Sequence, residues 1–141
     1  MSEPPASVDL QRISIQGHSL EYRQLAAMPA DAPTLVFLHE GLGSVSLWKD
    51  FPDRVAAACE CNALVYSRYG NGASDPLTAP RRPDYMHREA LETLPKLLDR
   101  LAIRNPVLLG HSDGASIAII FAGAFPARPT GLIVFAPHLF V

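Results

Sequence analysis

A Gly-x-Ser-x-Gly pentapeptide, Gly110 to Gly114, separates two apolar stretches of different character. Residues 106–109 favour a strand, and the alanine- and isoleucine-rich residues 115–125 favour a buried helix. A sharp turn between such elements presents its central side chain at the carboxyl end of a parallel strand, directly before a helix N-terminus. The two glycines let strand and helix approach closely, while Ser112 has to tolerate strained backbone angles. The pentapeptide therefore restricts the chain to folds with a strand–turn–helix unit and an exposed serine hydroxyl.

The rest of the chain supplies further strands of the same kind. Continuous apolar runs are typical of parallel strands buried on both faces of a sheet. Besides residues 106–109, such runs occupy residues 34–38, 62–67 and 130–136. Residues 12–16 and 20–25 alternate apolar and polar side chains, which predicts an N-terminal hairpin with Gly17 and His18 at a solvated turn.

Helical patterns lie between the buried runs. One is predicted from about Leu47 to Ala58, with Pro52 in the first turn of its main part. A second begins near Asp84, which can cap it, and keeps leucines on one face as far as Leu101. Pro95 lies inside this pattern and predicts a kink or a break. Alternating strands and helices predict an α/β fold, a mostly parallel sheet flanked by helices on both faces.

Length and composition are those of one soluble domain. The 141 residues fit one domain, which we expect to begin at residue 11 after a flexible segment at residues 1–10. A net charge of −2 with no basic run argues against nucleic acid as a partner. The start of the chain does not resemble a signal peptide, and the longest apolar run, Ile117 to Phe125, is shorter than the roughly 20 residues that span a bilayer. We therefore expect a cytoplasmic protein with no membrane contact.

The two cysteines do not indicate a metal site. Cys59 and Cys61 flank Glu60, and no histidine or further cysteine stands at ligand spacing from them. We expect reduced thiols in a cytosolic protein, with neither a metal nor a cofactor.

Three glycine-rich loops, in register with the predicted strands, resemble the α/β-hydrolase fold family over residues 11–141. Residues 38–43 (Leu-His-Glu-Gly-Leu-Gly) look like the loop after the family's third strand, usually His-Gly-x-x-Gly. Residues 67–74 look like Asp-x-x-Gly-x-Gly-x-Ser after the fourth strand, and residues 110–114 look like the nucleophile elbow. Two positions depart from the family, because Glu40 replaces a glycine and Ser67 replaces an aspartate. The resemblance implies the first six strands of this fold, without the lid and the C-terminal strands.

The resemblance implies a serine nucleophile at Ser112, where the alternative is an ordinary helix-capping serine. It also implies an oxyanion hole made by two backbone N–H groups, those of Asp113 and Gly41, with Leu42 as the alternative to Gly41. The Asp113 carboxylate itself is expected to lie at the helix N-terminus, stabilised by the helix dipole.

Other side chains near the predicted site are substrate-binding or loop-bracing candidates. By resemblance, His39 braces the first loop. His111 stands next to Ser112 on a sharp turn, so we expect its ring to point away from the hydroxyl as a brace or pocket wall. Trp48 belongs either to the core or to an acyl pocket. His138, two residues after the last predicted strand, could line the mouth of the site.

The family's catalytic triad follows the chain order serine, acid, histidine. After Asp113 the sequence contains no Asp or Glu, and its one histidine is His138. The resemblance places the acid after a seventh strand and the histidine after an eighth. We therefore expect a truncated hydrolase that is inactive alone, with its last strand, Leu132 to Phe135, exposed as an apolar edge.

Two functions follow from these observations. The first is a serine hydrolase that acts on an ester, lactone or similar carbonyl group of a small-molecule substrate. The alternative is a non-catalytic truncated hydrolase that serves as a binding or dimerisation module. Ser112 argues against haloalkane dehalogenases and epoxide hydrolases, which by family resemblance carry aspartate at this position. The sequence leaves the oligomeric state open.

Overall fold

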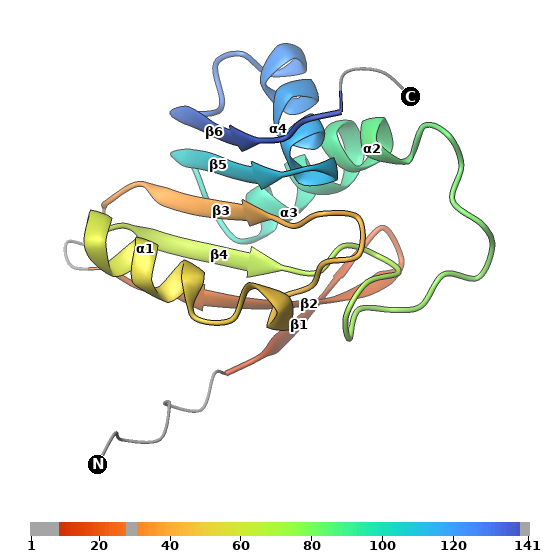
Figure 1. Ribbon diagram of the computed structural model, residues 1–141, viewed down its shortest axis with the longest axis horizontal. Helices are drawn as coiled ribbons and strands as arrows, with labels where there is room; N and C mark the ends of the chain where they lie inside the picture. The colour runs from red at the N-terminus through yellow and green to blue at the C-terminus, as the bar shows by residue number, and fades with distance from the viewer. Residues whose placement is uncertain (1–8, 28–30, 139–141) are drawn as a thin grey trace.

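A computed structural model describes residues 9–27 and 31–138. Its framework is a six-stranded sheet in the order β1-β2-β4-β3-β5-β6 (Figure 1). The strands are β1 (Gln11–Ile15), β2 (His18–Leu25), β3 (Thr34–Leu38), β4 (Asn62–Tyr66), β5 (Pro106–His111) and β6 (Gly131–Phe135). The last four are parallel to one another, and the β1–β2 hairpin joins the edge of β4 in antiparallel register. The predicted fold class, a mostly parallel α/β sheet, is therefore confirmed.

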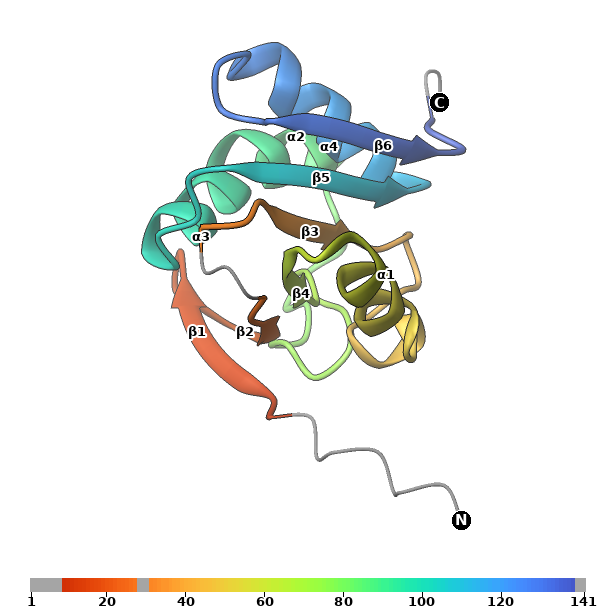
Figure 2. The ribbon, with the colours of Figure 1, turned by 90° about the vertical axis from the view of Figure 1, so that its left-hand side faces the viewer.

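Helices cover both faces of this sheet. The 3₁₀ turn η1 (Ser46–Trp48) and helix α1 (Phe51–Cys59) lie on one face (Figure 2). The other face carries α2 (Tyr85–Arg88), the π-helical turn η2 (Glu89–Thr93), α3 (Leu94–Arg100) and α4 (Asp113–Ala124). This layering leaves the carboxyl ends of the parallel strands, and the loops that follow them, along one edge of the molecule.

Two apolar cores result from the two-residue period of the strands. Leu35 and Phe37 of β3 pack in the core beneath α1. Val36 and Leu38, their neighbours in sequence, pack in the larger core beneath α3 and α4. Successive side chains of a strand point to opposite faces. A continuous apolar run in the sequence is thus used on both sides of the sheet.

Several predicted details need correction. The helix predicted from Leu47 is interrupted at Lys49, whose φ of 53° ends η1, so α1 begins only at Phe51, with Pro52 in its first turn. Asp84 occupies the position before α2 but makes no capping hydrogen bond, because its carboxylate pairs with Arg88 (3.1 Å). The predicted break around Pro95 is confirmed, since the π-helical turn η2 ends and α3 begins there.

His18 is another prediction that was wrong. The hairpin turns at Gln16 and Gly17, both with positive φ, and His18 is already the first residue of β2. Its ring stacks on Tyr69 at a centroid distance of 3.7 Å and is only partly exposed. The histidine therefore joins the hairpin to the loop after β4 instead of lying in solvent.

The last strand is an exposed apolar edge, as predicted. Leu132, Ile133, Val134 and Phe135 of β6 are between 37% and 50% exposed. Cys59 is exposed and Cys61 partly exposed, and both are free cysteines. No helix among the described residues is long and apolar enough to cross a bilayer. The predicted flexible segment at residues 1–10 falls mainly on residues 1–8, outside the described part of the chain.

Candidate active site

The turn between β5 and α4 has the geometry of a nucleophile elbow. Ser112 adopts φ 55° and ψ −115°, a strained conformation for a residue with a side chain. Gly114 must be a glycine, since a Cβ there would overlap the carbonyl of Leu38, and a Cβ on Gly110 would overlap the carbonyl of Gly114. Strand β5 and helix α4 therefore pack so closely that the side chain of Ser112 projects outward from the turn at the end of β5.

The Ser112 hydroxyl contacts an imidazole. Its Oγ lies 2.7 Å from Nε2 of His138, within hydrogen-bond distance. Ser116 of α4 holds the same segment in place, since its Oγ accepts the His138 N–H (2.8 Å) and donates to the His138 carbonyl (3.0 Å). Sequence reasoning placed His138 at the mouth of the site but missed this contact. The available signal was its position just after a strand that pairs with the elbow strand.

Asp113 also approaches His138, but at the same ring nitrogen. Its Oδ1 lies 3.4 Å from Nε2 of His138, while Oδ2 accepts the hydroxyl of Tyr85 at 2.6 Å. Burial and this bond to Asp113 raise the pKa of Tyr85. In a Ser-His-Asp triad the acid binds the other nitrogen, Nδ1, and so orients the ring toward the serine. Asp113 therefore does not occupy the position of a triad acid.

The loop after β3 lies directly against the elbow. A Cβ on Gly41 would sit 3.0 Å from Oδ2 of Asp113, so only glycine fits there without displacing that carboxylate. Asn71 donates to the carbonyls of Gly41 (3.0 Å) and Gly43 (3.2 Å), and Leu42 is 85% exposed. Among the described residues, the amides of Gly41, Leu42 and Asp113 donate no hydrogen bond. All three remain available to a ligand.

His39 is a buried brace beneath this loop. Its Nε2 accepts the backbone N–H of Arg68 (2.9 Å), so the proton lies on Nδ1, which donates to the Glu40 carbonyl (2.6 Å). Burial, followed by the charge of Arg68, lowers the pKa of His39 to about 3. The imidazole is therefore neutral at physiological pH, and both of its ring nitrogens are bonded to backbone groups of the two loops.

Arg68 completes the brace. Its buried guanidinium donates to the carbonyls of His39 (2.5 Å) and Glu40 (3.1 Å). Glu89 provides opposite charge in the same interior and accepts the hydroxyl of the buried Tyr66 (2.7 Å). Burial raises the pKa of Glu89, while the charge of Arg68 opposes that rise. Sequence reasoning did not single out Arg68, Tyr66 or Glu89.

Ser67, which replaces the family's aspartate, is bonded to a carboxylate from another strand. Its hydroxyl donates to Oε1 of Glu21 on β2 (2.7 Å) and accepts the N–H of Val45 (2.8 Å). The same Glu21 oxygen accepts the N–H of Ala73 (3.1 Å). The acidic group is thus present, but it comes from the N-terminal hairpin.

A hollow of about 240 Å³ opens between the loop after β3 and η1. Trp48 and His111 line it together with His39 and Glu40. Trp48 also meets the ring of Phe37 edge-on, at a centroid distance of 5.5 Å, so it serves both the core and the hollow. Within the described part of the chain, no group of His, Cys, Asp and Glu side chains could hold a metal ion.

Strand order, elbow and glycine-rich loops together define the class of the α/β-hydrolase fold. The model of the "Alpha/beta hydrolase family" matches residues 35–141, and the chain belongs to this family. Among solved structures, a hydrolase from Pseudomonas aeruginosa superposes with a TM-score of 0.79 at 23% identity, covering 96% of this chain and 49% of that one. A haloalkane dehalogenase from Agrobacterium tumefaciens gives a TM-score of 0.76 at 19% identity, covering 92% of this chain and 41% of that one.

Curated relatives carry several different hydrolase names. A haloalkane dehalogenase of Bradyrhizobium diazoefficiens is 23% identical over 91% of this chain and 39% of its own length. A proline iminopeptidase of Lactobacillus acidophilus is 29% identical over 78% of this chain and 37% of its own. A mouse (lyso)-N-acylphosphatidylethanolamine lipase is 29% identical over 76% of this chain and 31% of its own. The chain thus spans less than two fifths of the length of these relatives.

Proposed function

We propose that the protein is a serine hydrolase that cleaves an ester, lactone or similar carbonyl group of a small molecule, with Ser112 as its nucleophile. The observation that carries the proposal is the strained turn between β5 and α4, whose two closely packed glycines leave the Ser112 hydroxyl at the end of β5. A serine becomes nucleophilic when a neighbouring base takes its proton. The amides of Asp113 and Gly41 are proposed to bind the oxyanion.

The proposed reaction proceeds in two steps. Ser112 Oγ attacks the carbonyl carbon, a histidine takes the hydroxyl proton, and that proton passes to the departing alcohol. Water then attacks the acyl-serine, and the acid product leaves as the hydroxyl of Ser112 re-forms. Because Asp113 shares Nε2 of His138 with Ser112, it does not orient that ring as a triad acid does. We therefore propose that the acid and base of the complete triad lie outside residues 1–141, and that these residues alone turn over slowly.

The relatives named haloalkane dehalogenases bear on the reaction type. By the family resemblance, those enzymes attack with an aspartate where this chain has Ser112. A serine ester is hydrolysed at its carbonyl through the oxyanion hole, which suits acyl substrates. The proposal therefore favours acyl transfer to water over displacement of a halide.

A labelling experiment tests the nucleophile. A fluorophosphonate probe should modify Ser112, and peptide mass spectrometry should locate the label on that residue. Where a complete triad is present, Ser112→Ala should lower the rate of p-nitrophenyl butyrate hydrolysis at least about a thousandfold. His87→Gln, on an exposed part of α2, is the matched control and should change neither result. Undiminished hydrolysis by Ser112→Ala would rule out this nucleophile.

The base is tested separately. In the 141-residue chain, we expect slow turnover that His138→Gln changes less than about tenfold, because the ring lacks an orienting acid. Fast turnover that disappears in both Ser112→Ala and His138→Gln would instead identify His138 as the base.

One observation favours a second candidate, a dimerisation module. The outer edge of β6 is unpaired among the described residues, and its apolar side chains are exposed. An isologous dimer would pair two copies of this edge about a two-fold axis. Light scattering distinguishes the two, because a defined dimer of the 141-residue chain supports the module, whereas a monomer or an irregular aggregate contradicts it.

A further inference from the structure

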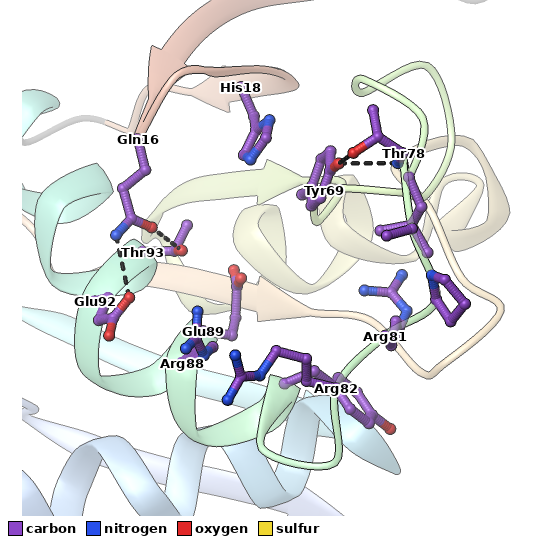
Figure 3. A pocket seen from close by; sticks show the side chains of 14 residues that line it. Gln16, His18, Tyr69, Thr78, Arg81, Arg82, Arg88, Glu89, Glu92 and Thr93 are labelled. Carbon is purple, nitrogen blue, oxygen red and sulfur yellow. Dashed lines mark hydrogen bonds between the residues drawn. The ribbon is translucent and has the colours of Figure 1, made fainter.

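A second hollow, of about 400 Å³, opens between the hairpin turn, the loop at residues 77–82 and the helical layer (Figure 3). The hairpin turn closes one side with Gln16 and His18, and residues 77–82 close another. The helical layer, α2 and η2, forms the remaining wall. Figure 3 shows the arginines of the loop and of the helical layer around this space.

The three arginines of this hollow differ in how their charge is neutralised. Arg82 and Arg88 share one carboxylate, that of Asp84, at 3.4 and 3.1 Å. Arg81 has no carboxylate partner in residues 9–27 and 31–138. It donates to the amide oxygen of Asn71 (2.6 Å), and its guanidinium lies 5.5 Å from the centre of the Tyr85 ring. Within the described residues, Arg81 is therefore the arginine of this hollow that forms no ion pair, although its charge also acts on the buried Glu89.

The carboxylates of the hollow limit the charge that a ligand can carry. Glu89 is buried, accepts the Tyr66 hydroxyl and interacts with the charges of Arg68 and Arg81. Glu92 lies within hydrogen-bond distance of Gln16 (3.3 Å) on the opposite wall. The carboxylates of Asp84, Glu89 and Glu92 balance the three arginines in number, so a phosphate dianion would add two negative charges to a lining with no excess of positive charge. A carboxylate monoanion matches the planar fork of a single arginine.

Hydrogen bonds connect this hollow to the candidate active site. Tyr85 lines the hollow and donates to Asp113, the residue after the nucleophile. Asn71, the partner of Arg81, donates to the carbonyls of Gly41 and Gly43 in the proposed oxyanion loop. One wall of the hollow is therefore continuous with groups that surround the reacting carbonyl.

We propose that Arg81 binds a carboxylate of the substrate, so that the protein acts on monoesters of dicarboxylic acids. The free carboxylate occupies the hollow beside Arg81, and the ester carbonyl of the same molecule reaches Ser112. The reaction part of this inference rests on the proposed function, whereas binding of the carboxylate does not. Tyr85, stacked beneath the guanidinium, fixes the arginine toward the ligand.

A binding titration tests the subsite without depending on turnover. Ser112→Ala protein is titrated with monomethyl glutarate, a monoanion, and with dimethyl glutarate, its neutral analogue, and amide shifts are followed by NMR. We expect the monoanion to bind about tenfold more tightly, and Arg81→Gln in the same background to remove that preference. Arg104→Gln removes the same charge from an exposed position before β5, at the opposite end of the strands, and should preserve the preference.

Hydrolysis gives the second measurement. In the catalytically complete protein, p-nitrophenyl hydrogen glutarate should be preferred to p-nitrophenyl butyrate, and Arg81→Gln should lower kcat/KM about tenfold for the acid ester alone. Equal binding of both glutarates, or the same loss in Arg81→Gln and Arg104→Gln, would overturn the subsite while leaving Ser112 as nucleophile. Hydrolysis unaffected by Ser112→Ala would overturn the proposed function, and the titration would still decide the subsite.

Discussion

His39 should make the stability of the fold depend on pH in a defined window. The pKa of His39 is about 3 in the folded protein, whereas an unburied histidine has a pKa of 6.5. The unfolded chain therefore binds a proton on this residue below pH 6.5, while the folded chain stays neutral down to about pH 3. Because the unfolded state then holds more protons, the free energy of unfolding falls as the pH falls through this window.

The magnitude follows from the size of the pKa difference. Each pH unit below 6.5 lowers the free energy of unfolding by about 1.4 kcal/mol. At pH 5, His39 therefore lowers the free energy of unfolding by about 2 kcal/mol. The full loss near pH 3 is between about 4 and 5 kcal/mol. The physical cause is first the burial of the ring, which disfavours its charged form. Protonation at Nε2 would also place a second cation beside Arg68 and abolish the hydrogen bond with the Arg68 N–H.

The measurement is urea unfolding followed by circular dichroism at pH 7, 6 and 5, for the native protein and for His39→Gln. Glu89, whose raised pKa acts in the opposite direction, is present in both proteins and cancels in the difference. We expect His39→Gln to be less stable than the native protein at pH 7. Between pH 7 and pH 5, however, its free energy of unfolding should fall by about 2 kcal/mol less than that of the native protein. His87→Gln, an exposed control, should follow the native protein. Parallel pH profiles for native and His39→Gln proteins would refute the argument.

Two further predictions concern the charges beneath the site. Arg68→Met should lower the free energy of unfolding by about 3 kcal/mol or more, because it leaves the buried Glu89 without the stronger of the two cations that act on it. Adding Glu89→Gln should recover at least half of this loss in urea unfolding, and equal stability of single and double variants would contradict the coupling. Ser67→Asp should lower the free energy of unfolding at pH 7 by about 1 to 3 kcal/mol, and with it the melting temperature, because it places a second carboxylate beside that of Glu21. Ser67→Asp with Glu21→Gln should melt near the native temperature, and a double variant no better than the single would refute this explanation.

Local steric rules made the nucleophile elbow predictable. Gly110 and Gly114 flank Ser112 between a strand pattern and a helix pattern, and the structure gives the steric reason for both glycines. Pro52 and Pro95 likewise indicated a helix start and a helix break. Proline fixes its own φ angle and lacks a backbone N–H, and both effects are independent of tertiary packing. Features governed by adjacent residues were therefore accessible from the sequence.

The charged interior was not predictable in the same way. Glu21 lies in a strand pattern and Glu89 in a helix pattern, where a single acidic residue is usually exposed to solvent. Their burial depends on Ser67 and Tyr66, which belong to other elements of the chain. The contact of His138 with Ser112 similarly depends on the pairing of β6 with β5. Such contacts follow from tertiary packing, which no local pattern encodes.

The bond between Glu21 and Ser67 has a consequence for the order of folding. It joins residues 46 positions apart, and the bond from Ala73 to Glu21 spans 52. Closing such loops costs chain entropy that is recovered only once the hairpin has docked against β4. The loops around Ser112 should therefore become rigid late in refolding, after the parallel strands have associated. Slowed docking of the hairpin would delay recovery of a competent site more than recovery of the sheet.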